Sequence, residues 1–176
     1  MNRLQLICGN VFHALRLLPL VALLVSPTIA RDVLHAVNPE GGTDLSFKDA
    51  SGGLIDVTVT QSRLDGSYPY HDALLWGGDI GVLPKSIVIA IQIQKDKRSI
   101  LVPISAYGDL GDVKSMSYSP MANGFRVSLH GGNTASSYDA SLYFERGVLT
   151  RREVRLRELP NERWEKSSYT FPTRVR

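Results

Sequence analysis

The sequence predicts an all-β domain, an antiparallel meander that forms a sandwich or a partly closed barrel, after an N-terminal signal peptide. Three observations support this fold class. Apolar and polar residues alternate over several short segments, turn-forming residues separate these segments, and helical periodicity is nearly absent. We expect residues 31–176 to form a single β-rich domain with a frayed C-terminal tail, since a chain of this length can bury a core of ordinary size.

Residues 1–30 have the parts of a secretory signal. Arg3 and Arg16 precede an apolar run at residues 17–25, and Thr28-Ile29-Ala30 follows it. The run is much shorter than the roughly 20 residues that span a bilayer. We therefore expect cleavage after Ala30, an exported protein that is periplasmic or secreted, and no stable membrane insertion after cleavage.

Composition excludes some functions for the mature chain. Removal of the signal takes away the single cysteine, so thiol and redox chemistry are not expected. It leaves 18 basic and 17 acidic residues, and this near-neutral balance argues against nucleic acid as a partner. Residues 31–145 hold nine Lys/Arg and 13 Asp/Glu, whereas residues 146–176 hold nine and four. Either the two parts neutralise each other, or the basic part presents a strip for an anionic ligand.

The first elements are a Gly- and Asp-rich loop at residues 38–53 and a strand at residues 54–62. Residues 87–104 predict a hairpin whose tip is Asp96-Lys97. On its first strand, isoleucines at every second position share one face. Pairing about the tip brings the two apolar faces together: Ile93 with Ile100, Ile91 with Val102, and Ile89 with Ile104.

The second hairpin is predicted around Asn123-Gly124, because this dipeptide suits a two-residue turn with positive φ at both positions. A loop at residues 107–114 precedes it. Pro120 has no N–H, so its strand is expected to be an edge or to be bulged there. The register again matches apolar faces: Ala122 with Phe125, Pro120 with Val127, and Tyr118 with Leu129.

A third hairpin occupies residues 136–158, and a final strand is expected near residues 166–171. A two-residue Arg146-Gly147 turn would place Leu142 opposite Arg151. A three-residue loop at Glu145-Arg146-Gly147 instead keeps the apolar face together: Phe144 with Val148, Leu142 with Thr150, Ala140 with Arg152, and Tyr138 with Val154. Arg152 then shares the apolar face, and we expect its stem to cover Ala140 while its head reaches water.

No motif dictates a chemistry. Nucleophile elbows, zinc-binding helices and phosphate loops are absent, which argues against an enzyme without excluding one, and no cofactor or metal is expected. The alternative catalytic set is His71, Asp72 and Asp79, since a histidine beside carboxylates can act as a general base. Asp109 and Asp112 offer weak calcium ligands, and the glycines at residues 131–132 offer a weak anion nest.

The predicted binding surface is a row of arginines. Arg151, Arg155 and Arg157 lie on one face of one strand, where they can meet successive anionic groups. A second group is aromatic, and consists of Tyr68, Tyr70 and Trp76 in a Gly- and Pro-punctuated connection with a possible helical turn at residues 73–76. We expect an exported, non-enzymatic binding module that acts on a protein or an anionic polymer of the envelope or the exterior. The alternative is an envelope-acting hydrolase or lyase that uses His71, Asp72 and Asp79.

Overall fold

A computed structural model describes residues 33–65, 75–78, 82–133, 136–159, 161 and 165–171. Several predictions concern other parts of the chain. The signal peptide, the frayed tail and the residues Tyr68, Tyr70, His71, Asp72 and Asp79 all lie outside the described residues. Their roles stay predictions.

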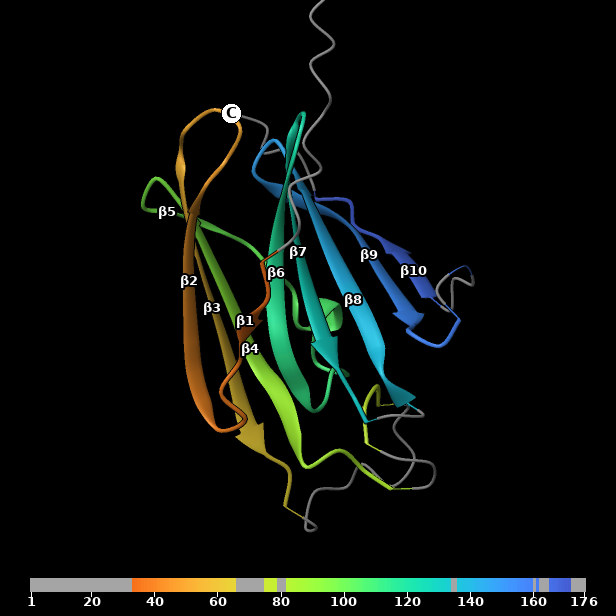
Figure 1. Ribbon diagram of the computed structural model, residues 1–176. Helices are drawn as coiled ribbons and strands as arrows, with labels where there is room; N and C mark the ends of the chain where they lie inside the picture. Colours follow the sequence, from red (N-terminus) through yellow and green to blue (C-terminus); the bar gives the residue numbers. More distant parts are fainter. Residues whose placement is uncertain are drawn as a thin grey trace, which may run out of the picture. The chain divides into compact units, whose positions relative to one another are not determined.

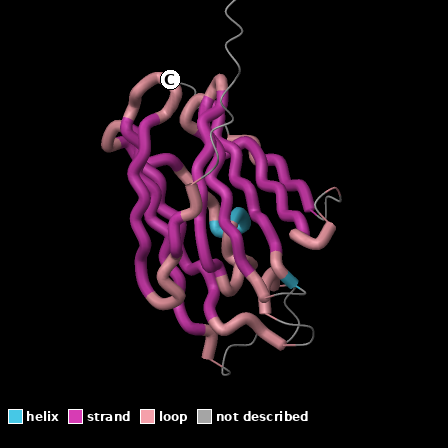
Figure 2. The backbone as a smooth tube through the Cα atoms, in the orientation of Figure 1, coloured by secondary structure: helices cyan, strands magenta, loops and turns pink. Residues whose placement is uncertain are grey.

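The described chain is all-β and forms two antiparallel sheets (Figures 1 and 2). One sheet has the order β1 (His35–Ala36), β6 (Val113–Met121), β7 (Gly124–Gly131), β8 (Tyr138–Glu145), β9 (Val148–Leu156), β10 (Glu165–Ser168). The other has the order β2 (Gly41–Lys48), β3 (Leu54–Arg63), β4 (Ser86–Lys95), β5 (Arg98–Ile100), and a 3-10 turn, η1 (Ile104–Ala106), follows it. In the described residues neither sheet closes into a barrel, and the pair is consistent with a β-sandwich.

Two expectations about the arrangement need correction. The meander expected from residue 87 to 158 is divided, because β4 and β5 belong to one sheet and β6 to β9 belong to the other. The predicted loop at residues 38–53 contains β2, which pairs along its whole length with β3. The glycines and the aspartate of this segment are typical of loops, and its apolar residues alternate with polar ones only at Leu45 and Phe47. In the described part of the chain, no helix has the length and apolar character that a membrane crossing requires.

Apolar side chains from both sheets form one buried cluster. The inward-facing residues of β8 are fully buried, as are Ile55 and Val59 of β3. Phe125 of β7 stacks on Phe144 with ring centroids 4.8 Å apart, and Phe47 of β2 meets Phe125 edge-on at 5.9 Å. Each such side chain contributes roughly 1.5–3 kcal/mol when it leaves water. This contact between aromatic rings therefore joins the two sheets.

The first hairpin confirms the predicted tip but is shorter than expected. Asp96 and Lys97 have φ angles of 49° and 65°, and Ile93 pairs with Ile100. The chain then leaves the sheet, so the predicted pairs of Ile91 with Val102 and of Ile89 with Ile104 are wrong. A bulge opposite Thr60 and Gln61 also turns Ile89 outward, where it is 52% exposed.

A buried glutamine accompanies this bulge. Gln61 is 1% exposed, and its Nε2 donates to the carbonyl oxygens of Asn38 (2.9 Å) and Val113 (2.8 Å). Its Oε1 accepts from the Val113 N–H at 3.0 Å and from the Ser86 hydroxyl at 3.2 Å. A buried amide is costly unless it is hydrogen-bonded. Gln61 is therefore fixed where β3, β4 and β6 meet.

The second hairpin has a different register from the predicted one. Met121 pairs with Gly124 and Pro120 with Phe125, so the turn residues are Ala122 and Asn123. This is a shift of two residues along the partner strand, which leaves every side chain on its expected face. Gly124 is required by close packing rather than by the turn, since a Cβ there would lie 1.8 Å from the Phe144 carbonyl oxygen. Pro120 lies on an edge as predicted, because β1 pairs only with Ser115 and Met116.

The three-residue loop predicted for the third hairpin is wrong. Arg146 and Gly147 form a two-residue turn with φ angles of 52° and 79°. A bulge at Thr150 of β9 then shifts the pairing and restores the apolar face. The resulting pairs are Leu142 with Arg152, Ala140 with Val154, and Tyr138 with Leu156. Alternation of apolar and polar residues favours an uninterrupted register and so does not indicate a bulge.

The head of Arg152 does not reach water as expected. The residue is 3% exposed, and one guanidinium nitrogen donates to both carboxylate oxygens of Asp109 at 2.7 and 2.8 Å. Another nitrogen donates to Glu165 of β10. A buried guanidinium needs such partners because its charge loses hydration. Arg152 thereby ties β10 and the connection between β5 and β6 to the inner face of β9.

Candidate binding site

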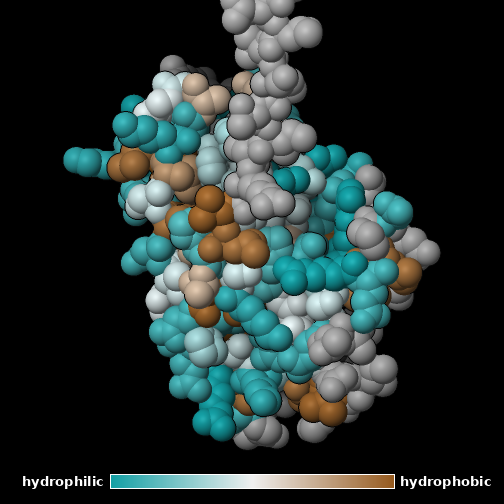
Figure 3. All heavy atoms as spheres, viewed as in Figure 1, coloured by the Kyte–Doolittle hydropathy of each residue, from teal (hydrophilic) through white to brown (hydrophobic). Residues whose placement is uncertain are grey.

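The six-stranded sheet has a polar outer face, by which we mean the face that points away from the apolar cluster. In β7, β8 and β9 the outward residues are Arg126, Ser128, His130, Asp139, Ser141, Tyr143, Arg151, Glu153 and Arg155. Figure 3 views this face, and hydrophilic side chains prevail over the part occupied by β8 and β9. The face is therefore open to polar partners and is not a second apolar contact surface.

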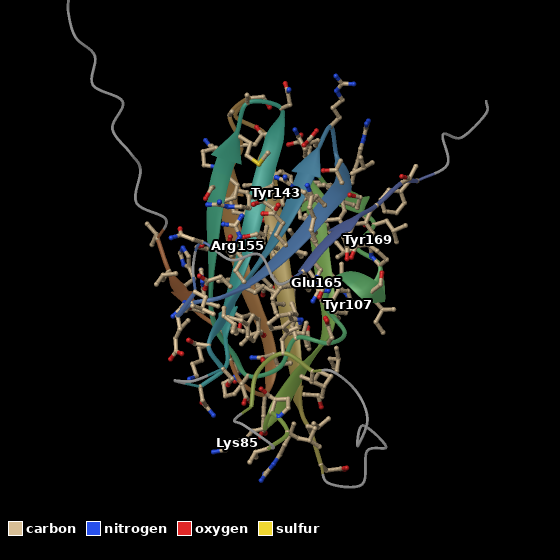
Figure 4. The ribbon with its side chains drawn as sticks, turned by 90° about the vertical axis from the view of Figure 1, so that its right-hand side faces the viewer. Lys85, Tyr107, Tyr143, Arg155, Glu165 and Tyr169 are labelled. Atoms are coloured by element: carbon tan, nitrogen blue, oxygen red, sulfur yellow. The ribbon has the colours of Figure 1, made fainter. Side chains whose placement is uncertain are left out.

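The predicted arginine row lies on this outer face, but each member already has a partner. The guanidinium of Arg151 lies 3.8 Å from the centre of the Tyr143 ring. Arg155 donates to Glu153 at 3.1 Å, and Arg157 donates to Asp139 at 2.8 Å. Figure 4 shows Tyr143 and Arg155 on one side of the sheet, and Glu165, Tyr107 and Tyr169 toward the other. Much of the row's charge is balanced within the protein.

Trp76 is not brought together with the arginine row. Its indole is half-buried and packs near Tyr138, with ring centroids 6.0 Å apart. Its Nε1 donates to Glu165 at 3.3 Å, and its backbone bridges to Leu110. Tyr138 is a fully buried inner-face residue, so these contacts place Trp76 with the core rather than with an exposed aromatic surface.

A larger hollow, of about 700 Å³, lies where the ends of strands from both sheets meet. We call it the basic hollow. Its lining residues are Pro39, Glu40, Arg63, Leu64, Lys85, Ser86, Asp112, Val113, Lys114 and Asn133. Figure 1 shows the end of β3 and the start of β4 at the lower end of the molecule, and Figure 4 shows Lys85 there.

Asp112 shapes the floor of the basic hollow. Its backbone is in the left-handed region at φ 49°, and its Oδ1 accepts from the backbone N–H groups of Lys85 (2.8 Å) and Ser86 (3.0 Å). Its own N–H donates to the Ser86 carbonyl at 2.9 Å. These bonds join the start of β4 to the start of β6. The Asp112 carboxylate therefore binds backbone N–H groups, whereas the Asp109 carboxylate binds the Arg152 guanidinium.

Three basic side chains surround this hollow with little internal compensation. Within the described residues, Arg63 and Lys85 make no ion pair with a carboxylate. Lys114 lies at a bulge of β6, and its Nζ donates to the Asn133 side-chain oxygen at 3.3 Å. All three side chains are exposed. A bulge re-aims a side chain from the regular alternation, and here it directs Lys114 toward the opening.

Two smaller hollows follow the basic hollow on the surface, and each shares lining residues with its neighbour. The linking hollow, of about 320 Å³, is lined by Lys114, Ser115, His130, Gly131, Gly132, Asn133, Ser137 and Arg157. The outer-face groove, of about 310 Å³, is lined by Arg126, Ser128, His130, Asp139, Ser141, Tyr143, Glu153, Arg155, Leu156 and Arg157. The N–H of Gly132 donates to the Asp112 carbonyl at 3.1 Å, so it is not free to take part in the anion nest considered for this loop.

His130 joins Ser117 and Asp139 in a hydrogen-bonded series across three strands. Its Nδ1 lies 2.6 Å from Asp139, and its Nε2 lies 3.1 Å from the Ser117 hydroxyl. Burial raises the pKa of Asp139, but hydrogen bonds from His130 and Arg157 outweigh it, so the pKa lies below its ordinary value. Asp139 is therefore ionised at neutral pH, and Nδ1 donates to it.

This order of groups is that of a serine hydrolase triad, but the surroundings do not suit one. Ser117 is 1% exposed and does not line the groove, so a substrate has no route to its hydroxyl. Ser117 pairs with Ser128 inside the sheet, where the backbone N–H groups take part in hydrogen bonds between strands. These groups are therefore not placed to stabilise an oxyanion, as a hydrolase requires. The series fixes the orientation of His130. Among the described residues, no group of three or more His, Asp, Glu or Cys side chains is arranged to hold a metal ion.

The residues of the basic hollow were missed by sequence reasoning. Arg63, Lys85 and Lys114 are far apart in the chain and carry no motif, and only the positions of strand ends signal that they can meet. Comparison with protein-family models, curated proteins and solved structures finds no match. The functional argument therefore depends on the residues themselves.

Proposed function

We propose that this chain is an exported, non-enzymatic binding module whose basic hollow takes an anionic partner. The observation that carries the proposal is a set of three exposed basic side chains, Arg63, Lys85 and Lys114, around a hollow of about 700 Å³. Among the described residues, none of the three forms an ion pair with a carboxylate. The volume falls within the range of ordinary ligand pockets.

The chemistry of the lining favours an anion over an apolar ligand. The acidic residues of the lining are Glu40 and Asp112, and Asp112 is already held by backbone N–H groups. An arginine presents a planar fork that binds a carboxylate or phosphate through two hydrogen bonds, and lysine adds a mobile point charge. Arg63 and Lys85 thus supply the two kinds of basic group that anion recognition uses.

The structure provides less support for the arginine row as the first contact. Arg151, Arg155 and Arg157 must give up part of an existing interaction before they bind an outside anion. The hydrolase or lyase alternative uses His71, Asp72 and Asp79, which lie outside the described residues, so no contact supports it. The binding module is the better-supported function.

Charge-removal variants test the proposal. The double variant Arg63→Gln/Lys85→Gln removes two charges from the basic hollow, and Lys97→Gln/Arg98→Gln removes two from the tip of the β4–β5 hairpin as a matched control. We expect the first variant to elute from an immobilised polyanion at clearly lower salt than the second, because local ion pairs are lost. Equal elution of the two variants would mean that only net charge matters, and the proposed site would be wrong.

A further inference from the structure

The three hollows form one path along the surface. Lys114 and Asn133 line both the basic hollow and the linking hollow. His130 and Arg157 line both the linking hollow and the outer-face groove. Neighbouring hollows share wall residues, so they lie next to one another on the surface. The series leads from the end of β3 and the start of β4, past the bulge of β6, onto β7, β8 and β9.

Basic groups are distributed along the whole path. The Lys and Arg residues in its lining are Arg63, Lys85, Lys114, Arg126, Arg155 and Arg157, and the Asp and Glu residues are Glu40, Asp112, Asp139 and Glu153. Two of these acids are occupied. Asp112 holds the backbone of β4, and the Glu153 side chain, 4% exposed, lies among Arg151, Arg155 and the Tyr143 hydroxyl. Asp139 accepts from His130 and Arg157 through one of its two oxygens, and the other oxygen and Glu40 can face a ligand.

Neutral polar groups separate the cations. Ser128 and Ser141 lie 3.1 Å apart in the outer-face groove, and Asn133 lies between the first two hollows. Asp139 is 40% exposed, and both of its hydrogen bonds from His130 and Arg157 use Oδ1. Its other oxygen is thus positioned to accept from a ligand hydroxyl. The path thus offers cations, hydroxyl groups and carboxylate acceptors.

We propose that this path binds one strand of an acidic polysaccharide, a polymer whose sugar units carry carboxylates and free hydroxyls. The inference rests on the proposed anion-binding function and names its ligand class. Sugar carboxylates pair with Arg63, Lys85 and Lys114 at one end and with Arg155 and Arg157 at the other. Sugar hydroxyls bind the serines and donate to Asp139. A small anion would fill only one of the three hollows, and the basic groups of the other two would have no ligand.

A polymer with a charge on every unit and no hydroxyl donors fits less well. Polyphosphate places an anion beside Asp139 and Glu153 wherever it follows the groove, and like charges at close range repel. Polyglutamate likewise brings a carboxylate with every residue, and only its backbone N–H groups can donate to Asp139. A chain with both hydroxyls and carboxylates avoids this repulsion, because a hydroxyl donates to a carboxylate.

The test compares ligand lengths by calorimetry on the full protein. The probes are galacturonic acid, oligogalacturonides of increasing length, polyphosphate, polyglutamate and neutral dextran. We expect affinity for oligogalacturonides to rise roughly tenfold or more with length and then level off once the path is filled. We expect Arg155→Gln/Arg157→Gln to weaken binding of the long oligomers only, and Arg63→Gln/Lys85→Gln to weaken binding of all lengths.

The outcomes separate the two proposals. If Arg63→Gln/Lys85→Gln weakens the affinity for long oligomers but Arg155→Gln/Arg157→Gln does not, the extended path is wrong and the basic hollow is still supported. If neither double variant weakens the affinity for oligomers more than the control Lys97→Gln/Arg98→Gln does, both proposals are wrong. Tighter binding of polyphosphate or polyglutamate than of long oligogalacturonides would overturn the polysaccharide. Thermal unfolding checks each variant, and Arg157→Gln alone replaces the double variant if that one fails to fold.

Discussion

At the scale of single residues, Arg152 shows how a charge can be kept inside this protein. Its guanidinium faces the core side of β9, and Asp109 and Glu165 bind it from two different segments. Neighbouring Arg151 points to the outer face and lies over Tyr143. The two arginines are adjacent in sequence, but because only Arg152 is buried, we expect them to contribute differently to the free energy of unfolding.

Replacement of each arginine by glutamine tests this difference. Arg152→Gln leaves two carboxylates without their cation, and we expect it to lower the free energy of unfolding by about 3 kcal/mol. Arg151→Gln removes a half-exposed guanidinium, and Glu153 keeps its bond from Arg155, so we expect a cost of less than about 1 kcal/mol. Urea unfolding measures both values. Similar losses in the two variants would show that Arg152 does not hold the connection to β9.

Asp49 provides a pH-dependent contribution. Its side chain accepts hydrogen bonds from Lys95, from the Ser51 N–H and hydroxyl, and from the Gly53 N–H. The bond from Lys95, followed by that from Ser51, holds the pKa of Asp49 well below its ordinary value of 3.8. A folded-state pKa below the unfolded-state pKa stabilises the protein at pH values above the latter, and this stabilisation is lost as pH falls.

Asp49→Asn should therefore be less stable than the original protein at neutral pH. We expect the difference in unfolding free energy to shrink as pH falls below about 4, because the Asp49 carboxylate of the unfolded chain then takes up a proton while the folded one stays ionised. Chemical unfolding at a series of pH values measures this. A difference that stays constant down to pH 2 would contradict the role assigned to the Lys95 pair.

At the scale of elements, alternation predicts strands well and bulges poorly. Residues 54–62, the tip at Asp96-Lys97 and the outward position of the arginine row all follow from a period of two. The bulges at Ile89, Lys114 and Thr150 do not, because a bulge depends on what the partner strand must accommodate. The bulge in β4 at Ile89 is an example. It lies opposite Gln61 of β3, whose buried amide is held by hydrogen bonds to Val113, a residue distant in sequence from both strands.

The bulge in β4 makes two isoleucines differ. Ile91 is buried in the cluster between the sheets, whereas Ile89 faces outward. We expect Ile91→Asp to lower the free energy of unfolding by several kcal/mol, roughly 3 or more, because a carboxylate loses hydration without a partner. Ile89→Asp should change it by less than about 1 kcal/mol. Equal damage by both substitutions would mean that the uninterrupted isoleucine face is right and the bulge is wrong.

At the scale of the described molecule, the candidate site depends on how the two sheets meet. Arg63 ends β3, Lys85 precedes β4 and Lys114 lies at the bulge near the start of β6. Their proximity therefore requires both sheets and the link through Gln61 and Asp112. Periodicity within a strand places a residue on a face but does not state which strand ends are neighbours. For this reason the arginine row could be predicted from one segment, whereas the basic hollow could not.

The central claim is that an anionic ligand binds at the basic hollow. An amide NMR titration of the full protein with trigalacturonate tests it most directly, because it locates binding without any substitution. We expect the largest shifts at the amides of Arg63, Lys85 and Lys114, with those of Lys97 and Arg98 nearly unchanged, and we expect added salt to reverse them. Shifts that are largest at the hairpin tip, or uniformly small at saturating ligand, would contradict the account.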